Sequence, residues 1–203
     1  LAAEVTPWAH WRLFGSLDLF SHPWWKYRIS KPSQGLDGMM QAKWNPHTSL
    51  QFTLNYRYKR KERDITGTSG QDIRPLHHHR TRLRMDYTSA LWQSQTTLDY
   101  NHLHQTNMKA SQGWSVSQRL SLKPKRWPLQ LTLQGSYFST DDYDSRIYTY
   151  EKGMLNTFST PSFYGDGIRL TCHLRWDYRW LSLLAKWGET RYFDRHEIGS
   201  GND

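Results

Sequence analysis

The chain has 203 residues, of which 36 % are hydrophobic and 15 % aromatic, and it carries a formal net charge of +9. The aromatic content argues against a disordered chain, and no apolar run approaches the roughly 20 residues of a transmembrane helix. A basic balance of this size admits nucleic acid, anionic lipid or an acidic ligand as a partner and does not choose among them.

Apolar and polar residues alternate with a period of two, which predicts β-strands along most of the chain. The clearest pattern sets an apolar register against a polar one: Ile168, Leu170, Cys172, Leu174, Trp176, Tyr178 and Trp180 against Arg169, Thr171, His173, Arg175, Asp177 and Arg179. The expected strands are residues 8–19, 36–44, 49–59, 79–87, 91–104, 113–122, 129–138, 167–178 and 181–193.

The connections between these strands alternate between long and short. Long ones are 20–35, 60–78, 105–112 and 139–166, and short ones are 45–48, 88–90, 123–128 and 179–180. A soluble sandwich has no reason to alternate in this way, whereas a bacterial outer-membrane barrel has short periplasmic turns and longer external loops. We therefore predict an all-β, antiparallel up-and-down transmembrane β-barrel.

The predicted barrel segment spans residues 1–203 and has about nine or ten strands. Because bacterial single-chain barrels have even strand numbers, we expect further strands and a longer protein. The connection 139–166 is long enough to be functional, and we expect it either outside the membrane or inside the barrel as a plug.

In such a barrel the apolar register faces lipid and the polar register faces the lumen. Trp and Tyr prefer the membrane interface, so the rings near strand ends are expected to form a girdle: Trp11, Trp44, Tyr58, Trp92, Trp114, Tyr178 and Trp180. The alternative is that they are ordinary core or loop anchors. The predicted location is the bacterial outer membrane, with membrane lipid, lipopolysaccharide and other outer-membrane or periplasmic proteins as partners.

The polar register predicts a charged lumen. Its residues are Arg57, Arg82, Arg84, Arg119, Arg169, Arg175 and Asp177. Rings of charged side chains of one sign set the ion selectivity of a pore. Alternatively, these arginines pair with acids in a filled barrel. If the loop 139–166 fills the lumen, its acids Glu151 and Asp166 are the expected partners.

The sequence favours neither an enzyme nor a metal site. Three adjacent histidines, 77–79, alternate faces on a strand, and without a second pair of matching spacing we predict no metal site and no cofactor. No Gly-x-Ser-x-Gly elbow occurs, so we predict a non-catalytic protein. The basic run 57–63 is interpreted as half strand and half solvated loop.

Two segments carry a family resemblance, "RIYTYEKGMLNTFSTPSFYGDGI" (146–168) and "RYFDRHEIGSG" (191–201). They resemble the barrel portion of the large helix-hairpin-helix-containing outer-membrane proteins of Bacteroidetes-type bacteria, a family of unassigned function. The resemblance covers about the last sixty residues. It implies an N-terminal helix-hairpin-helix region that this sequence lacks, so a nucleic-acid partner is expected only through that absent region.

The expected function is therefore a pore, or a scaffold component of an outer-membrane assembly. The alternative is a soluble basic β-domain that binds nucleic acid or glycan through surface aromatics, Arg and Lys.

Overall fold

The computed structural model describes residues 1–24, 29, 31–64, 73–106, 108–124, 127–154 and 160–194. These residues form strands and turns and no α-helix. None of them belongs to a helix that is long and apolar enough to cross a membrane.

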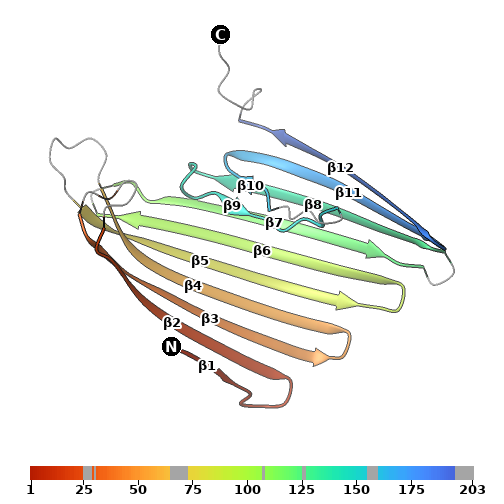
Figure 1. Ribbon diagram of the computed structural model, residues 1–203, viewed down its shortest axis with the longest axis horizontal. Helices are drawn as coiled ribbons and strands as arrows, with labels where there is room; N and C mark the ends of the chain where they lie inside the picture. Colours follow the sequence, from red (N-terminus) through yellow and green to blue (C-terminus); the bar gives the residue numbers. More distant parts are fainter. Residues whose placement is uncertain are drawn as a thin grey trace, which may run out of the picture.

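Ten strands form one continuous sheet (Figure 1). They are β1 (Ala2–Val5), β2 (Trp11–His22), β3 (Ser33–His47), β4 (Leu50–Asp64), β5 (Ile73–Thr88), β6 (Trp92–Gln105), β7 (Ser111–Leu122), β8 (Leu129–Thr140), β11 (Asp166–Tyr178) and β12 (Leu181–Tyr192). Each strand pairs antiparallel with its neighbour along the chain, except that β8 pairs with β11 across the long connection 141–165.

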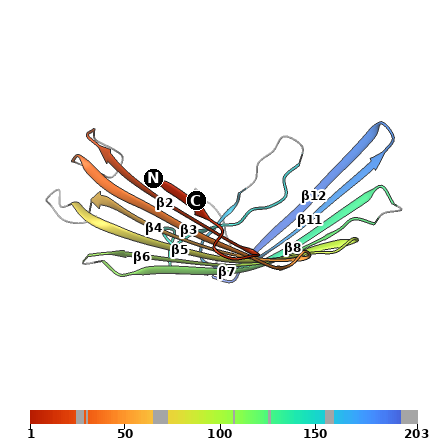
Figure 2. The same ribbon diagram turned by 90° about the horizontal axis from the view of Figure 1, so that it is seen from below.

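The sheet is strongly curved but not closed. Figure 2 shows it as a trough, with β1 and β2 on one wall and β11 and β12 on the other. The strand order starts at β1 and ends at β12, so these two strands are the edges. The trough has a concave and a convex face, and side chains alternate between the two faces along every strand.

The all-β, antiparallel up-and-down prediction is confirmed. All nine expected strands are present, and β1, β9 (Ile147–Tyr148) and β10 (Ser162–Phe163) are additional short ones. The prediction of a long loop over 60–78 was too broad, because β4 continues to Asp64 and β5 begins at Ile73. The basic run 57–63 therefore lies wholly in β4, and its solvated-loop half was wrong; residues 65–72 lie outside the described residues.

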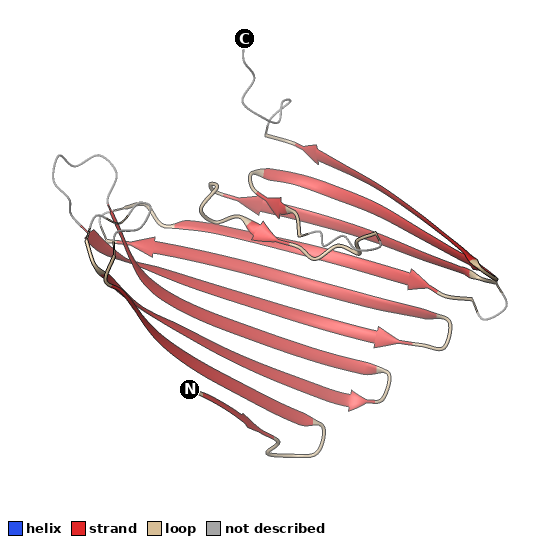
Figure 3. Cartoon of the chain, in the orientation of Figure 1, coloured by secondary structure: helices blue, strands red, loops and turns tan. Residues whose placement is uncertain are grey.

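The described parts of the long connection, residues 141–154 and 160–165, fold back over the concave face instead of projecting away from the sheet (Figures 2 and 3). Its two short strands, β9 (Ile147–Tyr148) and β10 (Ser162–Phe163), pair antiparallel. Phe163 stacks on Phe138 of β8 with ring centroids 4.7 Å apart, and both rings are buried together with Ile147. This apolar contact anchors the second arm of the connection to β8, and the pairing of Phe163 with Ile147 joins the first arm to it.

Burial is inverted relative to a soluble sheet protein. The buried apolar side chains among the described residues are Leu76, Leu103, Phe138, Ile147 and Phe163, whereas the buried polar and charged ones are far more numerous and lie mainly on the concave face or in the connection above it. Large apolar side chains on the convex face are exposed, for example Leu54 at 45 % and Leu170 at 49 %.

Candidate functional site

Strand register assembles the polar side chains into rows across the concave face. One row runs Asn55, Arg82, Asp99, Ser115, Phe138 from β4 to β8. The next runs Thr53, Arg84, Thr97, Ser117, Ser136, Arg169 and ends at Thr190. Because each row crosses many strands, arginines that are distant in sequence lie on one surface.

Residues 145–151 cross this surface, and their backbone carbonyls are bound by its side chains. Asn101 Nδ2 donates to the carbonyls of Ser145 and Arg146, at 3.4 and 2.9 Å. Arg82 Nη2 donates to the Tyr148 carbonyl at 3.0 Å. These bonds come from β5 and β6, and they attach the first half of the crossing segment to the centre of the sheet.

The second half is held from β7 and β8. Arg119 Nη2 donates to the Tyr150 carbonyl at 2.6 Å, and Gln134 Nε2 donates to the same oxygen at 3.3 Å. The Arg119 guanidinium also lies 5.1 Å from the centroid of the Tyr150 ring, a cation–π distance. The concave face therefore binds the backbone of this segment through side chains of β5, β6, β7 and β8.

Glu151 is the electrostatic centre of the contact. It is 1 % exposed, it accepts hydrogen bonds from both Nε and Nη2 of Arg169 on β11, and Lys186 Nζ on β12 lies 3.0 Å from its Oε2. Burial would raise the pKa of Glu151, but the hydrogen bonds from Arg169 and Lys186 outweigh burial, and the pKa lies below its ordinary value. Glu151 is thus held as an anion between two cations.

A second anchor lies at the start of the connection. Asp142 Oδ1 accepts hydrogen bonds from the Ser111 hydroxyl at 2.6 Å and from the backbone N–H groups of Asp144 and Ser145 at 2.9 and 3.0 Å. Next to it, Arg63 Nη1 of β4 lies 2.7 Å from Asp144 Oδ2. The turn at 142–145 is thereby tied to β4 and β7.

All six predicted arginines lie on the concave face, but they have different partners. Arg57 forms a bidentate pair with Asp37, at 2.7 and 2.6 Å, and Arg175 pairs with Asp177, at 3.0 and 2.8 Å. Among the described residues, neither pair forms a hydrogen bond or ion pair with the connection 141–165, although Arg57 lines a cavity together with Ile147 and Tyr148 of that connection.

The remaining predicted arginines lie near the centre. Arg82 Nε donates to Asp99 Oδ1 at 2.5 Å. Arg84 Nε lies 2.8 Å from Asp86 Oδ2 without hydrogen-bond geometry. Arg119 bonds to Gln95 and Gln134 besides the Tyr150 carbonyl and has no carboxylate partner among the described residues.

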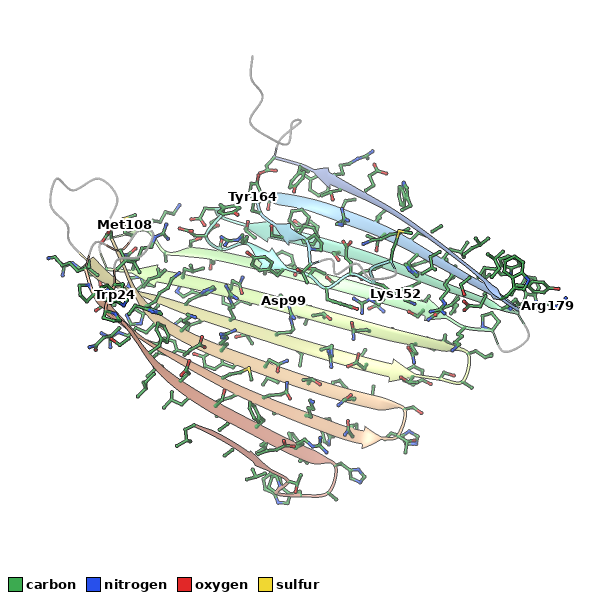
Figure 4. All side chains as sticks on the ribbon, viewed as in Figure 1. Trp24, Asp99, Met108, Lys152, Tyr164 and Arg179 are labelled. Carbon is green, nitrogen blue, oxygen red and sulfur yellow. The ribbon has the colours of Figure 1, made fainter. Side chains whose placement is uncertain are left out.

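The concave face also has open space beside the crossing segment. A cavity of about 230 Å³ is lined by Arg82, Arg84 and Arg119 together with Thr149 and Tyr150 of the segment. Figure 4 labels Asp99 near the middle of the sheet and Lys152 on the segment, with Trp24 and Met108 at one end of the strands and Arg179 at the other. The face is therefore only partly filled.

One predicted partner is misplaced. Asp166 was expected in the loop, facing the arginines, but it is the first residue of β11 and pairs with Ser139. That row contains Trp114 and belongs to the convex face. Among the described residues Asp166 makes no ion pair with an arginine, because Gly165, with a φ of 81°, ends the connection one residue earlier.

The predicted girdle residues lie on the convex face or in an adjacent turn. Near the turns 48–49, 89–91 and 179–180, Trp11 stacks on Trp44 at 5.7 Å, Trp92 packs against Tyr87 at 4.9 Å, and Tyr178 stacks on Trp176 at 5.6 Å. Trp180 is 88 % exposed in its turn. Tyr58 and Trp114 lie nearer the opposite strand ends, so aromatics occur at two levels.

Sequence reasoning missed a histidine cluster on the convex face. His77 and His79 of β5 are directly opposite His104 and His102 of β6. The short turn 88–90 could have revealed it, because extending that hairpin outward pairs the two His-x-His stretches. In their present arrangement, no three or more His, Cys, Asp or Glu side chains in the described part of the chain could hold a metal ion.

Comparisons with protein-family models, with curated proteins and with solved structures give no match. The resemblance of 146–168 and 191–201 to helix-hairpin-helix outer-membrane proteins therefore stays a prediction, and residues 195–201 of the second segment lie outside the described residues.

Proposed function

We propose that this chain forms the wall of a bacterial outer-membrane β-barrel whose interior is occluded by residues 141–165. The observation that carries the proposal is the inverted burial: exposed leucines and aromatics cover the convex face, while polar side chains are buried on the concave face. Apolar patches of this extent on a soluble monomer are rare and mark a membrane or protein interface.

A bilayer accounts for both faces at once. One row of register partners on the convex face crosses eight strands without a charged side chain. Its residues are Leu13, Ala42, Leu54, Leu83, Leu98, Val116, Tyr137 and Ile168. Lipid would cover this row, and the aromatic levels above and below it would sit at the interfaces. Because backbone groups must be paired inside a bilayer, the proposal requires that the edges β1 and β12 are paired when the protein is in the membrane.

The interior would carry positive potential. Arg80 and Arg119 have no carboxylate partner among the described residues, whereas Arg82 and Arg84 each pair with a single acid, Asp99 and Asp86. A channel lined in this way favours anions. The proposed role is thus an anion-preferring passage that is closed while the segment 145–151 is bound, and the chain itself performs no catalysis.

Lipid contact is the testable core of the proposal. Single cysteines at Leu98 on the convex face and at Asn55 on the concave face, in a Cys172→Ser background, are labelled with an environment-sensitive fluorophore in lipid vesicles. Brominated lipid should quench the label at position 98 and leave the label at position 55 unaffected. Equal quenching at both positions, or none at position 98, would favour the soluble basic β-domain.

Conductance tests the occluded interior. In planar bilayers, the protein extracted from membranes should conduct little, whereas a variant with residues 144–162 replaced by a short Gly-Ser turn should conduct and should prefer anions. Cation preference in that variant would contradict the proposed role of the arginines.

A further inference from the structure

Four imidazoles lie on the convex face, toward the beginning of β5 and the end of β6. His79 is the register partner of His102, and His77 is the register partner of His104. The ring centroids of His79 and His102 are 6.2 Å apart. Two cross-strand histidine pairs, two residues apart on the same face, thus form one cluster, separate from the concave site.

Two of these rings are oriented by tyrosines of the neighbouring strand β4. The Tyr56 hydroxyl lies 2.8 Å from Nδ1 of His79, and the Tyr58 hydroxyl lies 2.7 Å from Nδ1 of His77. When Nδ1 carries the proton and donates it to the phenol oxygen, Nε2 is left with its lone pair. Metal-binding histidines are commonly oriented by this kind of outer hydrogen bond.

The third ring of the cluster has a nitrogen without a partner. Nδ1 of His102 is buried and makes no hydrogen bond within the described residues. An imidazole with an unsatisfied nitrogen is not committed to another interaction and gains free energy when the ring binds a ligand. The neighbouring His104 is exposed and accessible from solvent.

We propose that His79 and His102 bind a borderline divalent transition-metal ion, Zn²⁺, Cu²⁺ or Ni²⁺, and that His77 or His104 completes the site only after its side chain moves, since in their present positions three or more such ligands do not converge among the described residues. Imidazole is a preferred ligand of these ions. With metal–nitrogen distances near 2 Å, two rings that share a metal have centroids at most about 6 Å apart. The observed 6.2 Å therefore requires only a small rotation of the side chains.

Copper titration of the full chain in detergent tests the proposal. Calorimetry should detect one tight Cu²⁺ site, and electron paramagnetic resonance should show hyperfine splitting from at least two imidazole nitrogens. Changing both His79 and His102 to Ala should abolish the tight site. Tyr56→Phe should weaken it about tenfold, because it removes the outer hydrogen bond.

The matched control removes two histidines elsewhere, His10→Asn with His47→Asn, and should leave Cu²⁺ binding unchanged. Since the Ala pair could disturb the sheet, His102→Gln serves as a conservative second variant and should also abolish the two-nitrogen signal. Unchanged binding in both cluster variants, or loss of binding in the control, would overturn the proposal. The result does not depend on lipid contact, so it stands or falls separately from the proposed barrel.

Discussion

Glu151 and Arg169 form a bidentate ion pair that joins the segment crossing the concave face to strand β11. Lys186 of β12 adds a second cation to the same carboxylate. Because Glu151 is separated from Arg169 by 18 residues and from Lys186 by 35, one side chain ties the long connection to the last two strands of the sheet.

Neutralising Glu151 should release the segment. In Glu151→Gln the Arg169 and Lys186 charges lose their buried partner, and we expect a loss of about 3 kcal/mol in the stability of the bound segment. Hydrogen exchange of the amides of residues 147–151 should rise accordingly. Asp177→Asn breaks an exposed pair with Arg175 and should leave this exchange unchanged. Equal protection of these amides in Glu151→Gln and in the wild type would show that Glu151 does not hold the segment on the concave face.

Gly113 of β7 lies directly beneath the start of the connection. A Cβ at this position would lie 2.7 Å from the Ser145 carbonyl oxygen and 2.7 Å from Thr140 Cγ2. Gly113→Ala should therefore push residues 142–146 away from β7 and lower the free energy of unfolding by about 1–3 kcal/mol, as measured by denaturant titration in micelles.

The matched control for this change is Gly135→Ala. A Cβ at Gly135 meets Leu170 Cδ2 at an ordinary 3.5 Å on the convex face, so this variant should unfold like the wild type. If the two alanine variants have the same stability, the connection does not pack against β7 as described.

The turn at Asp142 should open at acid pH. Burial raises the pKa of Asp142, but hydrogen bonds from Ser111, Ser145 and Asp144 outweigh burial and lower it overall. A carboxylate with a lowered pKa stabilises the fold above its unfolded pKa near 4, and this contribution is lost as the pH falls through the folded pKa. The protection factors of the Asp144 and Ser145 amides, measured against intrinsic exchange at the same pH, should fall below pH 4 in the wild type. Asp142→Asn should remove this pH dependence.

The two strand ends should lie on opposite sides of the membrane. Thr106 and Pro124 are both exposed, Thr106 beside a long connection and Pro124 in a short one. In a Cys172→Ser background on intact cells, a membrane-impermeant maleimide should label Thr106→Cys and spare Pro124→Cys until the outer membrane is permeabilised. The reverse pattern would invert the topology.

The strands could be predicted from sequence because alternation is a local signal. Leu170 and Thr171 already differ in polarity, and the structure places them at 49 % and 9 % exposure on opposite faces. The end of β4 and the beginning of β5 could not be predicted, because all five residues 60–64 are charged and Pro75 interrupts the alternation of apolar and polar residues. Residues 60–64 and 73–77 become strand because they pair with each other, and the sequence of neither segment alone shows this pairing.

The candidate site could be predicted only in part. Glu151 was correctly singled out because it is an acid in a long connection, but its pairing with Lys186 required the order β8, β11, β12 in the sheet. Backbone recognition by Asn101 and Gln134 left no sequence signal, since amides in the polar register look like ordinary lumen or surface residues. Asp166 was wrongly assigned to the loop because the sequence does not show that the connection ends at Gly165 and that β11 begins at Asp166.

The most direct test of the membrane-facing surface compares two neighbours on β4, Leu54 on the convex face and Asn55 on the concave face. In lipid vesicles, Leu54→Arg should lower the free energy of unfolding by about 2–4 kcal/mol, because it places a charge in the bilayer, while Asn55→Arg should cost far less. If Leu54→Arg is instead as well tolerated as an ordinary surface change and Asn55→Arg is the more costly, the convex face does not contact lipid and the proposed barrel is wrong.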